Sequence, residues 1–254
     1  TTNITIASGG VSPAKTTFNN NNVDYIIGGA GGINGSGDLV LNGSRTVMLT
    51  GENGFTGAVQ VNAGTLSISS GTAIASASGI ALNGVTFQIA SSTTVNPPVS
   101  VGALSLVDIG SNNVTFAGAL SGTGGLLMSG NGTLTVTGAN TFDGDLAVTG
   151  GALQGGTTQG AAYLGAVNGG RTITVDSGAT IALKVNNIFG GGGQAAAGLP
   201  SVVINGGTFD STRYNSIGNV TLNSGGTLSQ TATDSGGYQG YQFLGNVTAG
   251  GTSA

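Results

Sequence analysis

The sequence predicts an all-β protein that folds as a parallel β-helix of about ten to twelve coils, at roughly 20–25 residues per coil. Three observations lead to this fold class. Two stretches of the chain repeat each other, short runs of alternating apolar and polar residues recur throughout, and only 6% of the 254 residues are charged. We expect a single domain that covers residues 1–254.

The internal repeat is the clearest of these observations. Residues 35–66 align without a gap with residues 122–153, at a constant offset of about 87 residues. Self-similarity over a fixed distance is the signature of a repeat architecture, in which similar units stack on one another. The identical pairs include Leu39/Leu126, Thr46/Thr133, Thr50/Thr137, Asn53/Asn140, Phe55/Phe142, Gly57/Gly144 and Gly64/Gly151.

Short alternating runs rich in Val, Ile and Thr indicate β-strands, because successive side chains of a strand point to opposite faces. Helical periodicity has almost no support in this chain. In chain order, the predicted strands cover residues 3–6, 39–41, 47–49, 59–61, 66–68, 80–82, 104–106, 134–136, 173–175, 181–183, 202–204 and 220–222.

Pairs that contain glycine separate these strands, as at Asn42-Gly43, Asn83-Gly84 and Asn131-Gly132. Such residues tolerate positive φ, so the chain can turn sharply at each pair. Turns that recur at regular spacing between short strands favour a solenoid over a series of hairpins. Each coil of a solenoid forms backbone hydrogen bonds with the coil below and stacks like residues about 4.8 Å apart.

The composition fits such stacking and excludes several functions. Uncharged Thr and Asn stack in ladders, whereas Lys or Glu would repel. The net charge is −4, and the five basic residues are scattered, so we expect no binding of nucleic acid, which needs clustered Lys and Arg. No apolar run approaches about 18 residues, so we expect no membrane insertion. Absence of Cys excludes disulfides and thiolate metal sites, and we expect no cofactor.

Two segments resemble the autotransporter-associated β-strand repeat. They are LTVTGANTFDG at residues 134–144 with VTGGAL at 148–153, and LTGENGFTG at 49–57 with VNAGTL at 61–66. This resemblance implies a right-handed parallel β-helix that a bacterium with an outer membrane exports to its surface or to the extracellular space. It implies no catalytic residues, because the repeat is a structural unit.

The candidate catalytic or metal-binding residues are few. Without His, acid–base and nucleophilic catalysis that depends on histidine is excluded. Asp143 and Asp145 form the only tight acidic pair, which could hold a metal ion or act as paired carboxylates. The aligned residues of the other copy are Thr56 and Ala58, so the repeat does not require acids there. We therefore favour a structural role for the pair and expect no enzymatic activity.

The one aromatic concentration lies near the end of the chain, at Tyr238, Tyr241 and Phe243, with Tyr214 before it. Exposed tyrosines could stack on sugar rings, which makes these four residues candidate glycan-binding residues. The alternative is an apolar plug that packs on the last coils, and we favour this alternative.

These patterns predict a non-enzymatic structural protein that is secreted or displayed on a bacterial surface, as a self-associating extracellular fibre or matrix or as a segment of an adhesin passenger. The predicted partners are other copies of the chain, end to end or laterally, because a solenoid ends in unpaired strand edges and neither end of this chain resembles a cap. Surface glycans are a second class of partner. The alternative functions are a glycan-binding module and a polysaccharide-degrading β-helix enzyme.

Overall fold

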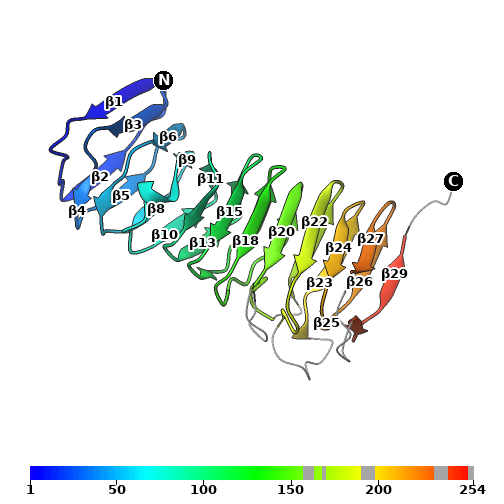
Figure 1. The fold of residues 1–254 in the computed structure, drawn as a ribbon. Coiled ribbons are helices and arrows are strands. Elements are labelled where there is room, and N and C mark those ends of the chain that lie inside the picture. Colours follow the sequence, from blue (N-terminus) through cyan, green and yellow to red (C-terminus); the bar gives the residue numbers. More distant parts are fainter. Residues whose placement is uncertain (157–162, 168–169, 190–197, 232–239, 251–254) are drawn as a thin grey trace.

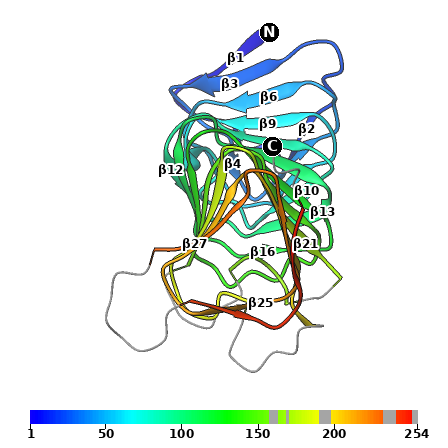
Figure 2. The ribbon, with the colours of Figure 1, turned by 90° about the vertical axis from the view of Figure 1, so that its right-hand side faces the viewer.

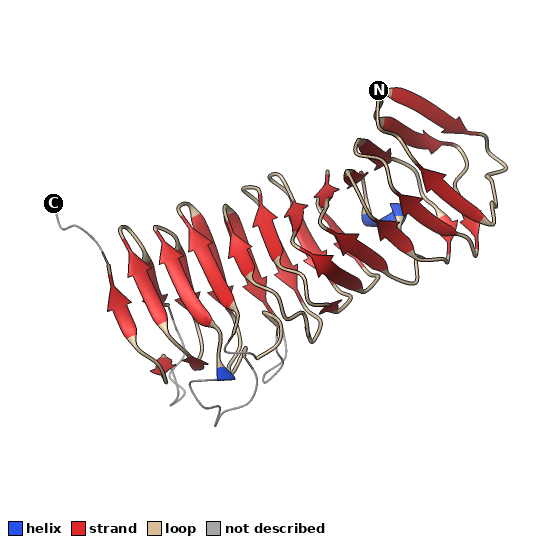
Figure 3. Ribbon diagram, turned by 180° about the vertical axis from the view of Figure 1, so that it is seen from behind, coloured by secondary structure: helices blue, strands red, loops and turns tan. Residues whose placement is uncertain are grey.

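A computed structural model describes residues 1–156, 163–167, 170–189, 198–231 and 240–250. The chain winds into an elongated stack of coils, and its N-terminal strand and its last strand lie at opposite ends of the stack (Figure 1). Among these residues strands dominate, and helix is confined to short turns such as the 3₁₀ turn η1, Gly71–Ala73 (Figure 3). All ladders between the described strands are parallel. The predicted parallel β-helix is confirmed.

The first face of the coil is one sheet that runs the length of the molecule and contains twelve of the described strands. This number agrees with the ten to twelve coils predicted. The strands of this long sheet are β1 (Thr2–Ile6), β3 (Tyr25–Gly29), β6 (Thr46–Leu49), β9 (Thr65–Ile68), β11 (Thr86–Ile89), β14 (Ser105–Asp108), β17 (Leu126–Ser129), β19 (Leu146–Val148), β21 (Thr172–Asp176), β23 (Ser201–Asn205), β26 (Val220–Asn223) and β29 (Val247–Ala249).

The second face begins as a short strand pair, continues through η1, and becomes a seven-stranded sheet. The amide of Gly71 in η1 donates to Oγ1 of Thr93, which joins the turn to the first strand of that sheet. The pair consists of β4 (Asn34–Gly35) and β7 (Gly54–Phe55), and the sheet of β12 (Thr93–Val95), β15 (Asn113–Phe116), β18 (Thr133–Val136), β20 (Gly151–Gly155), β22 (Ala179–Leu183), β24 (Thr208–Ser211) and β27 (Thr227–Gln230).

The third face is a six-stranded sheet in the N-terminal half and a strand pair near the C-terminal end. Figure 2 places β12 and β27 on one side of the stack, with strands of the third face on the other. The six strands are β2 (Lys15–Phe18), β5 (Asp38–Leu41), β8 (Val59–Val61), β10 (Ile80–Asn83), β13 (Val99–Ala103) and β16 (Leu120–Ser121), and the pair is β25 (Asn215–Ile217) with β28 (Tyr241–Phe243).

The core fills the inside of the coils with aligned columns of apolar side chains. Along the long sheet, Val47, Leu66, Phe87 and Val107 pair in register from β6 to β14, and each is fully buried. Burying such a side chain contributes about 1.5–3 kcal/mol relative to leaving it exposed. Stability is therefore distributed along the whole stack, since each coil adds its own members to these columns.

One predicted strand is shifted in the structure. The alternation at residues 104–106 predicts a strand with Leu104 and Leu106 on its buried face. The strand β14 instead begins at Ser105 and buries Ser105 and Val107, while Leu104 is 66% exposed. The buried column of the neighbouring strands, Phe87 and Met128, aligns with Val107 and fixes this phase.

The two copies of the repeat occupy different faces of the coil. Leu39 lies in β5 on the third face, whereas its equivalent Leu126 lies in β17 on the first face. Thr46 lies in β6 on the first face, whereas Thr133 lies in β18 on the second. The offset between the copies thus covers four coils and one further face. The repeated unit is not tied to one face of the solenoid.

Candidate functional site

The repeated asparagine bridges three successive coils at a corner. Oδ1 of Asn53 accepts from the amide of Ile33 at 2.8 Å, and its Nδ2 donates to the carbonyl of Ala73 at 2.9 Å. These partners lie 20 residues before and 20 residues after Asn53. Corner backbone groups, which would otherwise have no partner in the turn, are satisfied in this way.

Asn140 forms the same bridge one face further round. Its Oδ1 accepts from the amide of Leu120 at 2.7 Å, its Nδ2 donates to the carbonyl of Tyr163, and its side chain is 1% exposed. Identity between Asn53 and Asn140 therefore reflects a common structural role, coil-to-coil bonding at corners.

The repeated threonine and glycine also serve coil stacking. Thr50 and Thr137 each donate their hydroxyl to a carbonyl of the coil below, Ile27 and Phe116 respectively. A Cβ added at Gly57 would lie 2.3 Å from the carbonyl oxygen of Gly37, and one added at Gly144 would lie 2.2 Å from that of Gly124. The motif that identifies the repeat is thus a set of contacts between coils.

The acidic pair of the second copy lies beside a buried arginine. Asp143 and Asp145 are exposed, and Oδ1 of Asp145 accepts from the amide of Thr172 at 2.7 Å. Arg171 is 2% exposed, and its guanidinium lies 4.6 Å from the centre of the Phe142 ring. As a lone basic residue, Arg171 carries no local motif that would have predicted this role.

Arg171 connects several turns of the solenoid through backbone carbonyls. Its Nε donates to Gly144 at 3.0 Å, and its Nη1 donates to Leu164 and Ala166 at 2.7 and 2.9 Å. Burial lowers the pKa of Arg171 to about 10, against the opposing effect of Asp143 and Asp145. The acidic pair therefore balances a buried positive charge. Within the described ranges, no group of three or more His, Cys, Asp or Glu residues could hold a metal ion.

The aromatic candidates divide between the core and the surface of the last coils. Tyr241 and Phe243 in β28 pair in register with Asn215 and Ile217, both buried residues of β25. The Tyr241 ring lies 6.2 Å from Phe209 and 6.0 Å from Phe243, and its hydroxyl donates to the carbonyl of Phe209 at 3.1 Å.

Burial of Tyr241, reinforced by the carboxylate of Asp210, raises the pKa of its hydroxyl. The hydroxyl of Tyr214 donates to Oε1 of Gln242 at 2.6 Å on the outer side of β25 and β28. Tyr238 lies outside the described residues. The described candidates therefore do not form one aromatic platform, and their role in glycan binding stays a prediction.

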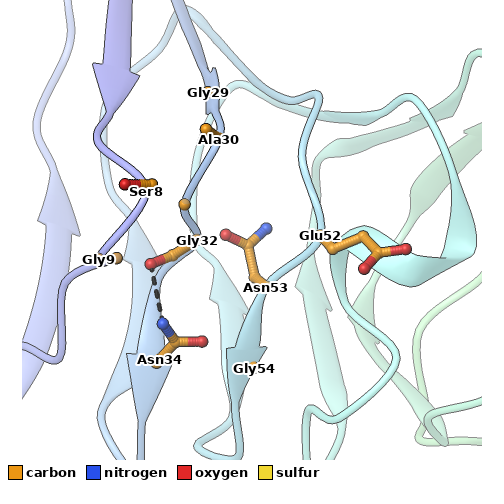
Figure 4. Close-up of a pocket in the computed structure, with 11 residues that line it drawn as sticks. Ser8, Gly9, Gly29, Ala30, Gly32, Asn34, Glu52, Asn53 and Gly54 are labelled. Carbon is orange, nitrogen blue, oxygen red and sulfur yellow. Dashed lines mark hydrogen bonds between the residues drawn. The ribbon is translucent and has the colours of Figure 1, made fainter.

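A polar cleft crosses the corners of the first three coils. It could not be predicted from the sequence, because its residues come from three separate turns. Its volume is about 520 Å³. Figure 4 shows Asn34 with its amide nitrogen directed to the carbonyl of Gly32, a hydrogen bond of 3.2 Å. The lining residues are Ser8, Gly9, Gly10, Gly29, Ala30, Gly31, Gly32, Asn34, Glu52, Asn53 and Gly54.

Helices long and apolar enough to cross a membrane are not found among the described residues. No solved structure matches the chain. Over 147 residues, which are 57% of its length, the chain is 31% identical to the Adhesin BmaC autotransporter of Brucella suis biovar 1 (strain 1330). The chain spans only 4% of the length of that relative.

The two copies of the repeat are matched by a known family. Residues 34–68 and 126–154 match the family described as the passenger-associated-transport-repeat. Both matched segments contain the bridging asparagines and stacking glycines described above, and the predicted resemblance is confirmed. The chain is therefore a parallel β-solenoid, two segments of which match the passenger-associated-transport-repeat.

Proposed function

We propose that this chain is a segment of an adhesin-type autotransporter passenger, displayed on the outer surface of a bacterium or released from it. The observation that carries the proposal is the structural role of the matched repeats. Their shared residues, such as Asn53 and Asn140, connect coils and so build an elongated rod. A rod presents binding surfaces away from the cell. The name of the relative, an adhesin autotransporter, supports an adhesive role.

We further infer that the segment is not an enzyme. The one acidic pair that resembled paired catalytic carboxylates lies against Arg171 and is explained by charge balance. Substituting Asp143→Asn tests this point. We expect polysaccharide substrates incubated with the chain to remain intact with or without the substitution. Cleavage that the substitution removes would instead establish a polysaccharide-degrading enzyme.

Surface display tests the adhesive role. Residues 1–254 are fused to the membrane domain of an autotransporter and displayed on bacteria that do not attach to host cells or to glass. We expect displayed chains to be accessible to external protease and the bacteria to attach. The matched control carries Gly144→Ala, which introduces a Cβ 2.2 Å from a backbone oxygen and disrupts the stacking of coils. Folded chain at the surface without any gain in attachment would contradict the proposal.

Self-association is a second candidate function, favoured by where apolar side chains are exposed. Of the six large hydrophobic residues that are exposed among the described residues, all but Leu104 lie in the first or the last coils: Ile4, Val11, Val23, Phe243 and Val247. The first coils also contain an apolar cleft of about 500 Å³ around Ile6 and Phe18. The exposed apolar surface of such end coils favours the stacking of a further coil. For the purified chain, a second copy supplies that coil.

A further inference from the structure

The polar cleft of the first three coils offers hydrogen-bond acceptors that the fold does not use. Nδ2 of Asn34 is fixed by its bond to the carbonyl of Gly32, so its Oδ1 remains as an acceptor. Gly9, Ala30 and Gly31 also belong to the cleft lining, and among the described residues no backbone amide donates to their carbonyls. In contrast, Asn53 uses both ends of its amide for the coil-to-coil bridge and serves as scaffold.

The charge at the cleft limits the chemistry of a ligand. Glu52 is the only charged residue that lines it, and no basic side chain does so. In Figure 4 the carboxylate of Glu52 is turned away from Asn34, at the edge of the cleft. An anion would find no positive partner here. A single metal ion would fill little of the 520 Å³ and would meet only one carboxylate, at the rim.

We propose that this cleft binds a neutral carbohydrate, whose hydroxyls donate to Asn34 Oδ1 and to the unused carbonyls. The cleft crosses three coils, a distance of about 10 Å at about 4.8 Å per coil. Its volume lies in the range of small-molecule sites, about 300–1,000 Å³. The site therefore accepts a short stretch of glycan chain along the solenoid axis. This inference deepens the proposed adhesive role by naming a class of ligand.

Glycine in the cleft allows a substitution that blocks the site without disturbing the coils. A Cβ added at Gly9 meets no atom within 4 Å, so Gly9→Leu adds bulk to a residue of the cleft lining without a clash at its Cβ. Gly79→Leu on the third face is the matched control, because the nearest atom to its Cβ would be at an ordinary contact distance of 3.5 Å. Both variants should unfold at the temperature of the parent chain.

Saturation-transfer NMR of the full chain with glucose, galactose, mannose and N-acetylglucosamine, each alone, tests the proposal. We expect at least one of these sugars to bind, Gly9→Leu to weaken that binding at least about tenfold, and Gly79→Leu to leave it unchanged. Sialic acid and inorganic phosphate, as anionic probes, should not bind. Failure of all four neutral sugars, or equal binding by Gly9→Leu, would overturn the assignment.

Surface display separates this site from the adhesive role. If bacteria that display the Gly9→Leu chain attach as well as those that display the parent, and purified chain binds no sugar, the carbohydrate site is wrong while the adhesive role stands. If purified chain binds sugar but the displaying bacteria do not attach, the site stands and the adhesive role is wrong.

Discussion

At the scale of single residues, the repeated asparagine contributes more to the stability of the fold than the exposed asparagines of the same chain do. Asn140 is 1% exposed and bonds to coils on both sides. A second set of asparagines, Asn19, Asn42, Asn62 and Asn83, also forms a ladder from coil to coil, but on the surface. When an exposed asparagine is substituted, water forms hydrogen bonds with its former partners. When a buried asparagine is substituted, its former partners remain unpaired.

Asn140→Ala should therefore lower the free energy of unfolding by about 2–4 kcal/mol, because it removes two buried hydrogen bonds between coils, from the amide of Leu120 and to the carbonyl of Tyr163. Asn62→Ala in the exposed ladder should cost less than about 1 kcal/mol. Urea unfolding followed by circular dichroism measures both. Equal losses for the two variants would show that corner asparagines are not special.

Arg171 is held by geometry that lysine cannot reproduce. Its planar guanidinium donates to three carbonyls and lies over the Phe142 ring, and lysine has neither the fork nor the flat face. Arg171→Lys should lower the free energy of unfolding by about 1–3 kcal/mol. Arg45→Lys, at an exposed position, should change it by less than about 0.5 kcal/mol in the same urea titration.

Tyr241 should make the fold sensitive to alkaline pH. Its pKa is raised by burial, so above pH about 10 the unfolded chain loses this proton while the folded chain keeps it. The unfolded state then binds fewer protons, and stability falls with rising pH by up to about 1.4 kcal/mol per unit. Arg171 acts in the opposite direction, because its pKa is lowered to about 10 and its folded form releases the proton first.

Comparison with Tyr241→Phe isolates the tyrosine. At neutral pH the variant should be less stable by about 1 kcal/mol, since it lacks the hydrogen bond to the carbonyl of Phe209. Above pH about 10 this difference should shrink and then reverse. Thermal unfolding between pH 7 and 11.5 measures it, and a constant difference across that range would contradict a raised pKa.

At the scale of the strand and turn, the alternation of apolar and polar residues predicted most strands. It did not always predict which residues of a strand face the core. Strands 47–49, 59–61, 134–136 and 202–204 were predicted where β6, β8, β18 and β23 lie. The phase at Leu104 was wrong, because the buried face is set by Phe87 and Met128 in neighbouring coils, and these contacts are not local. The polar cleft was missed for the same reason, since its residues meet only after three coils have stacked.

The tight turns give a sharp prediction at this scale. A Cβ at Gly144 would lie 2.2 Å from the carbonyl oxygen of Gly124 in the adjacent coil, so Gly144→Ala must separate two coils. We expect a loss of about 2–4 kcal/mol in urea unfolding. Gly9→Ala, with open space at the Cβ position, should unfold as the parent does. A tolerated Gly144→Ala would mean that the glycine of the repeat is not required for stacking.

At the scale of the whole molecule, the solenoid is a stack whose interior is buried and whose two end coils present apolar surface. Among the described strands, the outer strands of the long sheet, β1 at one end and β29 at the other, each pair on one side only. Free strand edges and exposed apolar side chains are both features that favour association. Coils of the same solenoid or of a second copy would satisfy the same edges.

We therefore expect the purified chain to associate end to end as its concentration rises, with filaments or short linear stacks visible by electron microscopy. Joint substitution of Phe243→Ser and Val247→Ser, both exposed in the last coils, should shift sedimentation towards the monomer, and loss of the contact between the Phe243 and Tyr241 rings should lower the unfolding temperature only slightly. Leu104→Ser is the control, because Leu104 is the most exposed of the large apolar residues that the structure describes but lies on the side of the stack. If Leu104→Ser prevents association and the double variant does not, the contact between copies is lateral, and the end coils are not the surface through which copies associate.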